Sequence, residues 1–184
     1  MSAAGNINHK FRLDGRAVLV AGAGRGIGRA CAVAMAHAGA QVWLMSRTQG
    51  ELDAAVAEIN RAGGKAHALV CDVTDAAAVK DAVAQLPRLD VLVNNAGTNI
   101  PEPFVNVSEA NLDHVLNLNI RAMFITAQAA VKKMQEDPQR KSRGGCVINI
   151  TSQMGHVGAP TRTVYCMTKH AMEGFTKALA VELA

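Results

Sequence analysis

A tyrosine and a lysine four residues apart are the pair in this chain whose spacing most directly indicates chemistry. Tyr165 is the single tyrosine among 184 residues, and Lys169 follows it by four positions. On a helix, residues i and i+4 share one face about 6 Å apart. An ammonium at that distance stabilises a phenolate and lowers the tyrosine pKa from about 10 toward the working range. The pair predicts a tyrosine acid–base group, and Ser152, thirteen residues earlier, follows an apolar segment at the expected ligand-binding edge of a sheet.

A glycine-rich turn follows the first apolar segment of the chain. Residues 21–28 read AGAGRGIG, in which Gly22, Gly26 and Gly28 have the spacing GxxxGxG. Positions without a Cβ atom allow a strand to turn sharply into a helix, and they allow backbone N–H groups to approach a pyrophosphate at the helix N-terminus. A tight connection without a ligand is the alternative. The position between a predicted strand and a predicted helix favours dinucleotide binding.

The end of the second predicted strand bears on the choice of dinucleotide. A dinucleotide fold commonly places an acidic residue there for the ribose 2′-hydroxyl, but this chain has Ser46 and Arg47, and no acid until Glu51. A carboxylate would repel a 2′-phosphate, whereas arginine binds one bidentately. Arg25, inside the glycine turn, adds a second positive charge. We expect NADP(H) to be preferred and NAD(H) to be possible; the alternative is that both arginines are ordinary surface residues.

Apolar segments of strand length alternate with helical patterns along the chain, and these elements must position the residues above. Continuously apolar strands are typical of a parallel sheet covered on both faces. The sequence therefore predicts an α/β fold, a doubly wound, Rossmann-type parallel sheet in three α/β/α layers. Strands are expected at residues 17–20, 42–45, 66–70, 91–93 and 147–150, and helices at 27–38, 52–62, 76–85 and 108–135, the last as one helix or two end to end.

Boundary residues support these elements. Gly39 and Gly63 with Gly64 are expected to end helices, whereas residues 74–75 and 108–109 are typical of helix N-caps. No repeat or linker divides the chain, so residues 1–184 are expected to form one domain with residues 1–12 as a mobile arm. The chain ends in what looks like an unfinished helix. In the stretch 108–135 the residues expected on the buried side are Leu112, Val115, Leu116, Ile120, Met123 and Phe124.

Composition excludes several classes of protein. Hydrophobic residues make up 49% and charged residues 18% of the chain, which excludes a disordered chain. No apolar segment approaches the roughly 20 residues of a membrane span, and the first ten residues lack the pattern of a secretory signal. The net charge is +4, but residues 132–143 mix basic and acidic side chains without aromatics. The four cysteines are far apart, which indicates reduced thiols. We expect a cytoplasmic protein with no metal site and no membrane or nucleic-acid partner.

The ordered set of motifs resembles the short-chain dehydrogenase/reductase family. After the glycine turn come Asp72, the run Asn94-Asn-Ala-Gly97, Asn119, Ser152 and Tyr165 with Lys169, in the family's order from about residue 11 to the C-terminus. The sequence also resembles, more loosely, the 3-oxoacyl-carrier-protein reductase and the sugar or polyol dehydrogenase branches. The resemblance implies an oxidoreductase that transfers a hydride between a nicotinamide and a carbonyl or secondary alcohol, such as a 3-oxoacyl thioester or a sugar or polyol.

The same resemblance implies a role for each matching residue. Tyr165 would be the proton donor or acceptor, and Lys169 would lower its pKa and bond the nicotinamide ribose. Ser152 would bond the substrate oxygen, and Asn119 would hold a water that relays the proton, although Asn119 taken by itself is more simply interpreted as a helix cap. Asp72 would bond the adenine amino group. The implied cofactor contacts are Gly22, Gly24, Arg25, Gly26, Ile27, Gly28, Ser46, Arg47, Asp72, Val73, Asn95, Ala96, Gly97, Tyr165 and Lys169.

Two departures from the family pattern accompany this resemblance. Ala21 stands where the family usually has threonine, so a side-chain bond between the glycine turn and the Asn94 region is expected to be missing. Family members also continue past the helix that carries Lys169, so the last strands of the family fold are expected to be lacking. The alternative is therefore a truncated, catalytically weak dinucleotide-binding fragment or an assembly module. The helices expected at 111–135 and from 164 onward resemble the family's dimer bundle, which implies a homodimer or homotetramer.

Overall fold

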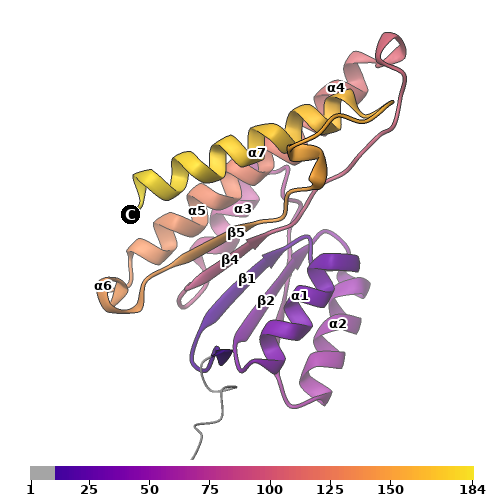
Figure 1. Cartoon of the computed structure of the whole chain (residues 1–184). Coiled ribbons are helices and arrows are strands. Elements are labelled where there is room, and N and C mark those ends of the chain that lie inside the picture. The colour runs from indigo at the N-terminus through magenta and orange to yellow at the C-terminus, as the bar shows by residue number, and fades with distance from the viewer. Residues whose placement is uncertain (1–10) are drawn as a thin grey trace, which may run out of the picture.

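The computed structural model describes residues 11–184, and most of the arm expected at residues 1–12 lies outside this part. Five strands form a parallel sheet in the order β3-β2-β1-β4-β5, with β1 in its centre (Figure 1). Sequential strands diverge from β1 in both directions, which is the doubly wound arrangement expected from the sequence. The strands are β1 (Ala17–Ala21), β2 (Gln41–Ser46), β3 (Lys65–Val70), β4 (Val91–Asn94) and β5 (Cys146–Asn149).

Helices cover both faces of the sheet and complete the three expected layers. One face carries α1 (Gly26–His37) and α2 (Gln49–Arg61), and the other carries α3, α5 and α7 (Figure 1). On this second face the elements are α3 (Ala76–Ala84), α5 (Met123–Gln135) and α7 (Thr163–Glu182), and α4 (Glu109–Leu116) and η3 (Asn117–Ala122) lead into α5. Shorter helical turns are η2 (Phe104–Asn106), α6 (Arg140–Arg143) and η4 (Gln153–Gly155).

Two apolar clusters hold the layers together, one on each face of the sheet. Because successive strand residues point to opposite faces, Val18 and Val20 of β1 pack toward Leu52 of α2, whereas Leu19 packs toward Val79 of α3. All five side chains are fully buried. Burial on both faces explains why the central strands are continuously apolar in sequence.

The long helical stretch contains the main correction to the sequence-based expectations. It continues from α4 through the π-helical segment η3 into α5, and Val115 and Met123 are buried as expected. Leu112, Leu116 and Ile120 are half-buried, but the expected burial of Phe124 is wrong, because its side chain is 48% exposed. The wider π-turn changes the angular spacing that the α-helical pattern assumed, and Phe124 lies on the outer side, 5.5 Å from the Phe175 ring of α7.

Helix ends follow the expected capping chemistry. Asp75 accepts hydrogen bonds from the N–H groups of Ala77 and Ala78 at the start of α3, and Ser108 accepts one from Asn111 at the start of α4. Gly39 follows α1 with φ +101°, a conformation that glycine adopts without strain. The ends of several elements differ from the expected ones by one to three residues, as in α2, which begins at Gln49.

A buried carboxylate fixes the amino ends of three strands. Asp90, directly before β4, accepts a 2.7 Å hydrogen bond from the N–H of Ala17 in β1. Its oxygens also lie 3.1 Å from Nε of Arg88 and 3.2 Å from Nε of Arg143, the latter near the start of β5. Burial alone would raise the pKa of Asp90, but the Ala17 N–H and the arginines hold the pKa below its ordinary value.

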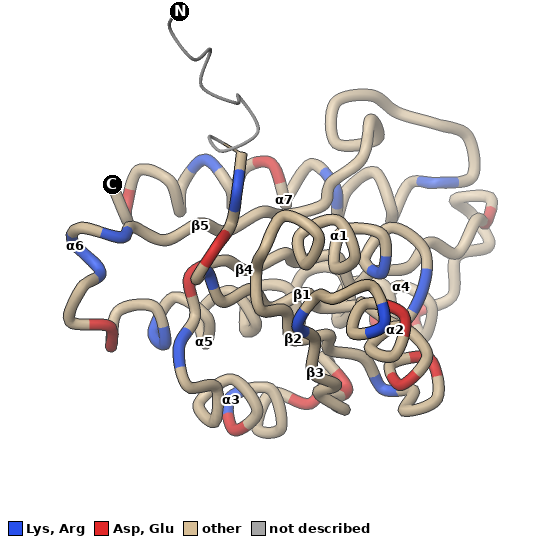
Figure 2. Tube along the Cα trace, turned by 90° about the horizontal axis from the view of Figure 1, so that it is seen from below, with Lys and Arg blue, Asp and Glu red and all other residues tan. Residues whose placement is uncertain are grey.

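The surface of the described residues shows no sign of a membrane span or a metal centre. No helix within residues 11–184 is long and apolar enough to cross a bilayer, and these residues contain no group of three or more metal-ligating side chains. Basic segments (blue) and acidic segments (red) are interspersed along the chain, and an acidic segment lies near the basic residues around α6 (Figure 2). The four cysteines are free thiols.

Candidate functional site

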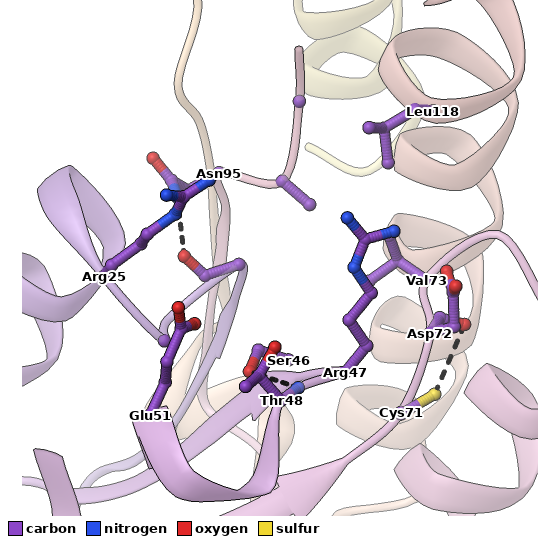
Figure 3. A pocket seen from close by; sticks show the side chains of 14 residues that line it. Arg25, Ser46, Arg47, Thr48, Glu51, Cys71, Asp72, Val73, Asn95 and Leu118 are labelled. Carbon is purple, nitrogen blue, oxygen red and sulfur yellow. Dashed lines mark hydrogen bonds between the residues drawn. The ribbon is translucent and has the colours of Figure 1, made fainter. Parts of the chain in front are cut away.

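A cleft of about 310 Å³ opens at the carboxyl edge of the sheet, around the ends of β1, β2 and β4 (Figure 3). This is the edge at which doubly wound sheets bind ligands. Ten of the residues expected to contact a cofactor line it: Gly22, Gly24, Arg25, Ser46, Arg47, Asp72, Val73, Asn95, Ala96 and Gly97. Thr48, Glu51, Cys71 and Leu118 line it as well, whereas Gly26, Ile27, Gly28, Tyr165 and Lys169 do not.

The glycine turn is closely packed against the end of β4. Gly22 has φ +76°, and a Cβ atom there would lie 2.8 Å from backbone atoms of Ala96. A Cβ atom on Gly28 would overlap the carbonyl of Gly22 and the side-chain amide of Asn95. Asn95 donates from Nδ2 to the Gly22 carbonyl at 3.0 Å. This hydrogen bond from Asn95 joins the turn to the end of β4, even though Ala21 has no side-chain donor to do so.

The start of α1 has the features that a phosphate group requires. Arg25 is its N-cap residue and forms no side-chain capping hydrogen bond, so the first N–H groups of the helix are not capped in this way. The helix dipole favours an anion at this end. Gly26 follows with φ +57° and has no atom within 4 Å of an added Cβ. The open glycine turn, the uncapped helix start and Arg25 together fit the pyrophosphate of a dinucleotide.

Charged side chains surround the end of the cleft near β2 and β3. Asp72 accepts hydrogen bonds at Oδ1 from the N–H and the hydroxyl of Thr74, at 2.9 and 2.7 Å. These bonds, with the nearby charge of Arg47, lower the pKa of Asp72. Burial, together with the charges of Asp75 and Asp72, raises the pKa of Cys71, so its thiol stays neutral at pH 7. The cleft thus contains an ionised carboxylate beside an arginine.

Among the four cleft residues that the sequence did not assign to the site, Glu51 is the charged one. At the end of the second strand the sequence offers Ser46 and Arg47 as candidates and has no acid before Glu51. In the structure the first turn of α2 brings the Glu51 carboxylate back to the cleft, between Arg25 and Ser46 and on the side opposite Asp72 (Figure 3). The signal was present as the pattern Thr48-x-x-Glu51, which is typical of a helix start.

The predicted tyrosine–lysine pair lies on α7. Nζ of Lys169 is 5.6 Å from the centroid of the Tyr165 ring, so the two side chains are neighbours on this helix. The Lys169 side chain is buried, and its ammonium donates a 2.8 Å hydrogen bond to the carbonyl of Ile150, just beyond β5. Burial lowers the pKa of Lys169. The ammonium thus joins α7 to the end of the sheet beside Tyr165.

Ser152 lies two residues beyond Ile150, in a loop that is attached to α7. Its Oγ accepts a 3.2 Å hydrogen bond from the N–H of Met154 in η4. The preceding Thr151 donates from Oγ1 to Oε1 of Glu173 at 2.6 Å, and Nε2 of His156 lies 3.5 Å from the same oxygen. Glu173, one helical turn after Lys169, therefore holds both sides of the serine loop.

Asn119 connects the loop after β4 to the tyrosine helix. It is buried inside η3, so the helix-cap interpretation of this residue is wrong. Its Nδ2 donates to the carbonyl of Thr98 at 2.8 Å and to Oγ1 of Thr168 at 3.1 Å, and its Oδ1 accepts from the Thr98 N–H at 2.8 Å. Thr168 in turn donates to the Tyr165 carbonyl at 2.8 Å. The amide therefore positions α7 against the cleft.

Comparison with known proteins places this arrangement in a family. A family model described as short chain dehydrogenase matches residues 16–184. The chain belongs to the short-chain dehydrogenases. This short-chain dehydrogenase is 39% identical over 177 residues to a cyclopentanol dehydrogenase of Comamonas sp., an alignment that covers 94% of this chain and 69% of that protein. It is 37% identical over 173 residues to an L-xylulose reductase of Mus musculus, with 93% and 67% covered.

Solved structures agree with this assignment. The short-chain dehydrogenase superimposes with a TM-score of 0.86 on a gluconate 5-dehydrogenase of Burkholderia cenocepacia in complex with NADP and tartrate, at 32% sequence identity. The match covers 95% of this chain and 68% of that one. The protein is therefore an enzyme of a family that oxidises alcohols or reduces carbonyl compounds with a nicotinamide dinucleotide. The chain spans about two thirds of the length of the relatives that it matches.

Proposed function

We propose that this short-chain dehydrogenase is an NADP(H)-preferring oxidoreductase that interconverts a carbonyl compound and a secondary alcohol. The observation that carries the proposal is the cleft at the carboxyl edge of the sheet, which Arg25, Ser46 and Arg47 all line. Two guanidinium groups beside a hydroxyl suit a 2′-phosphate, because arginine binds phosphate bidentately. The NADP bound to the gluconate 5-dehydrogenase of similar fold supports the same preference.

The glycine turn and the start of α1 bind the pyrophosphate in this proposal. Gly22, Gly24 and Gly26 let the backbone approach it, and Gly28 and Ile27 continue into the first turn of α1, whose N–H groups are directed toward it. The ionised Asp72 accepts a hydrogen bond from the adenine amino group, next to Val73. On the side of β4, Asn95, Ala96 and Gly97 contact the second ribose.

Tyr165, Ser152 and Lys169 act on the substrate oxygen. A bound nicotinamide supplies or accepts the hydride. In reduction, Tyr165 donates its phenolic proton to that oxygen while Ser152 donates a hydrogen bond to it, which stabilises the developing charge. The Lys169 ammonium, 5.6 Å from the Tyr165 ring, favours the resulting phenolate and bonds the nicotinamide ribose. In oxidation the phenolate accepts the proton. In this proposal Asn119, whose amide bonds Thr98 and Thr168, also holds the water that relays the proton.

The substrate is a small carbonyl compound or alcohol of the sugar or polyol class, with a 3-oxoacyl thioester as the other class. The names of the L-xylulose reductase and the gluconate 5-dehydrogenase support the first class. We also propose a homodimer or homotetramer associated through α4, α5 and α7. The ring of Phe124 supports this assembly, because it is 48% exposed on the outer side of α5 beside Phe175.

The test combines cofactor binding with turnover. The full chain is titrated with NADPH and with NADH by fluorescence, and NADPH oxidation is followed with L-xylulose, keto-gluconates, cyclopentanone and a 3-oxoacyl thioester. We expect tighter binding of NADPH, and Arg47→Ala should reduce the preference by about 1–3 kcal/mol. Equal affinities of the parent protein for both dinucleotides would refute the cofactor preference. Binding without turnover of any compound would favour a dinucleotide-binding or assembly role.

A further inference from the structure

Glu51 lies where a helix-capping glutamate is expected, but it makes no capping bond. Thr48 is the N-cap residue of α2, and Glu51 follows three positions later, where a glutamate ordinarily accepts a hydrogen bond from the N-cap N–H. Here the Thr48 N–H donates to Oγ of Ser46 instead, at 3.3 Å. Within residues 11–184, no hydrogen bond or ion pair joins the Glu51 carboxylate to another residue. The carboxylate is therefore available to a ligand in the cleft.

The glycine turn packs directly on this side chain. A Cβ atom added to Gly24 would overlap Oε2 of Glu51 and would lie 3.0 Å from Oγ of Ser46. A side chain at position 24 would therefore displace the Glu51 carboxylate from its place beside Ser46. Glu51 is half-buried, and its carboxylate lies beside Ser46 at the end of β2, as part of the cleft wall (Figure 3). This is the region in which dinucleotide folds hold the adenosine ribose.

The charge of Glu51 opposes that of the two arginines. A carboxylate accepts hydrogen bonds from the adjacent hydroxyls of an unmodified ribose. A 2′-phosphate replaces one of these donors by a group that carries close to two negative charges, which the carboxylate repels and the guanidinium groups attract. The same cleft wall thus contains one group that favours NAD(H) and two that favour NADP(H).

We propose that Glu51 is a specificity-determining residue of the cofactor cleft. It binds the adenosine ribose hydroxyls of NAD(H), weakens the binding of the 2′-phosphate of NADP(H), and so limits the preference that Arg25 and Arg47 establish. This inference rests on the proposed dinucleotide-dependent function. It assigns to Glu51 in the first turn of α2, five residues beyond the end of β2, the discrimination that an acid at the strand end provides in other dinucleotide folds.

The test is the Glu51→Gln variant, which removes the charge and retains the shape of the side chain. The dissociation constants of NADPH and NADH are measured by fluorescence titration on the full chain. We expect NADPH to bind more tightly and NADH more weakly than in the parent protein, so that the ratio of the two constants moves toward NADPH at least fivefold. The matched control is Asp53→Asn, because Asp53 is exposed on α2, bonds Gln49 at 2.6 Å and does not line the cleft.

The outcomes separate this inference from the function on which it rests. A ratio that changes less than fivefold in Glu51→Gln, or that changes equally in Asp53→Asn, overturns the role of Glu51 while the parent protein still prefers NADPH. A parent protein that binds neither dinucleotide overturns the proposed function, and the role of Glu51 with it. Thermal melting of both variants near the parent temperature verifies that the comparison concerns folded protein.

Discussion

Replacing Asp90 by asparagine tests how the sheet is held at the edge opposite the cleft. Asp90 has a side chain only 2% exposed, and it accepts hydrogen bonds from the Ala17 N–H at 2.7 Å and from Nε of Arg88 and Arg143 at 3.1 and 3.2 Å. Nη1 of Arg16 lies 3.5 Å away. An asparagine of the same shape has no charge to offset these cations, and its NH2 group would face donors.

The magnitude follows from the burial of each partner. Breaking a buried ion pair by removing one member costs about 3–5 kcal/mol. The arginines, however, are partly exposed, with side-chain exposures of 36%, 37% and 26% for Arg16, Arg88 and Arg143. Because water partly resolvates them, we expect a loss at or below the lower limit of that range, about 2–3 kcal/mol of unfolding free energy at pH 7.

Urea denaturation of the full chain, followed by circular dichroism from pH 7 to pH 3, measures this difference. The lowered pKa of Asp90 means that its contribution is present above the unfolded pKa and is lost as pH falls through the folded value. The difference in unfolding free energy between the parent protein and Asp90→Asn should therefore have its full value at pH 7 and become smaller below about pH 4. Asp113→Asn, at an exposed position of α4, should stay within about 0.5 kcal/mol of the parent. A loss below 1 kcal/mol, or a gap independent of pH, would refute the reasoning.

Three further substitutions probe the site itself. Tyr165→Phe removes the proton donor, so steady-state turnover should fall below a tenth of the parent rate while the NADPH dissociation constant, from titration, stays within about threefold; higher activity would exclude Tyr165 as the acid. Gly28→Ala places a methyl group against the amide of Asn95, so both dinucleotides should bind at least tenfold more weakly, and unchanged titrations would contradict the role of the turn. Glu173→Gln weakens the hydrogen bond from Thr151, so kcat should fall several-fold while the affinity for NADPH stays nearly constant. A kcat equal to that of the parent would show that the serine loop does not need this hydrogen bond.

The sequence was sufficient for the architecture because a doubly wound sheet has a strong local pattern. Strands buried on both faces, such as β1 and β4, must be apolar throughout, and the helices between them have their own period. The caps at Asp75 and Ser108 were identifiable for the same reason, because capping involves residues two or three positions apart. The position of the cleft at the carboxyl edge followed once the glycine turn was placed after β1.

Features that depend on contacts distant in sequence were less accessible. The expectation assumed one α-helical period through residues 117–122, which form the π-helical segment η3, so the exposure of Phe124 was not anticipated. The bond from Lys169 to the Ile150 carbonyl joins α7 to the end of β5 and is not encoded in the Tyr-x-x-x-Lys spacing. The orientation of Glu51 depends on which acceptor the Thr48 N–H contacts, and that acceptor is Oγ of Ser46 at the end of the preceding strand.

Isotope transfer tests the central claim most directly, namely that this chain moves a hydride from the nicotinamide to a carbonyl carbon. The full chain is incubated with NADPH deuterated at both C4 positions and the best carbonyl compound of the substrate panel, and the product is analysed by mass spectrometry and NMR. We expect one deuterium, bound to the carbinol carbon, and a strong loss of this product in Tyr165→Phe. A product without deuterium at that carbon, or equal incorporation in the Tyr165→Phe variant, would contradict the claim.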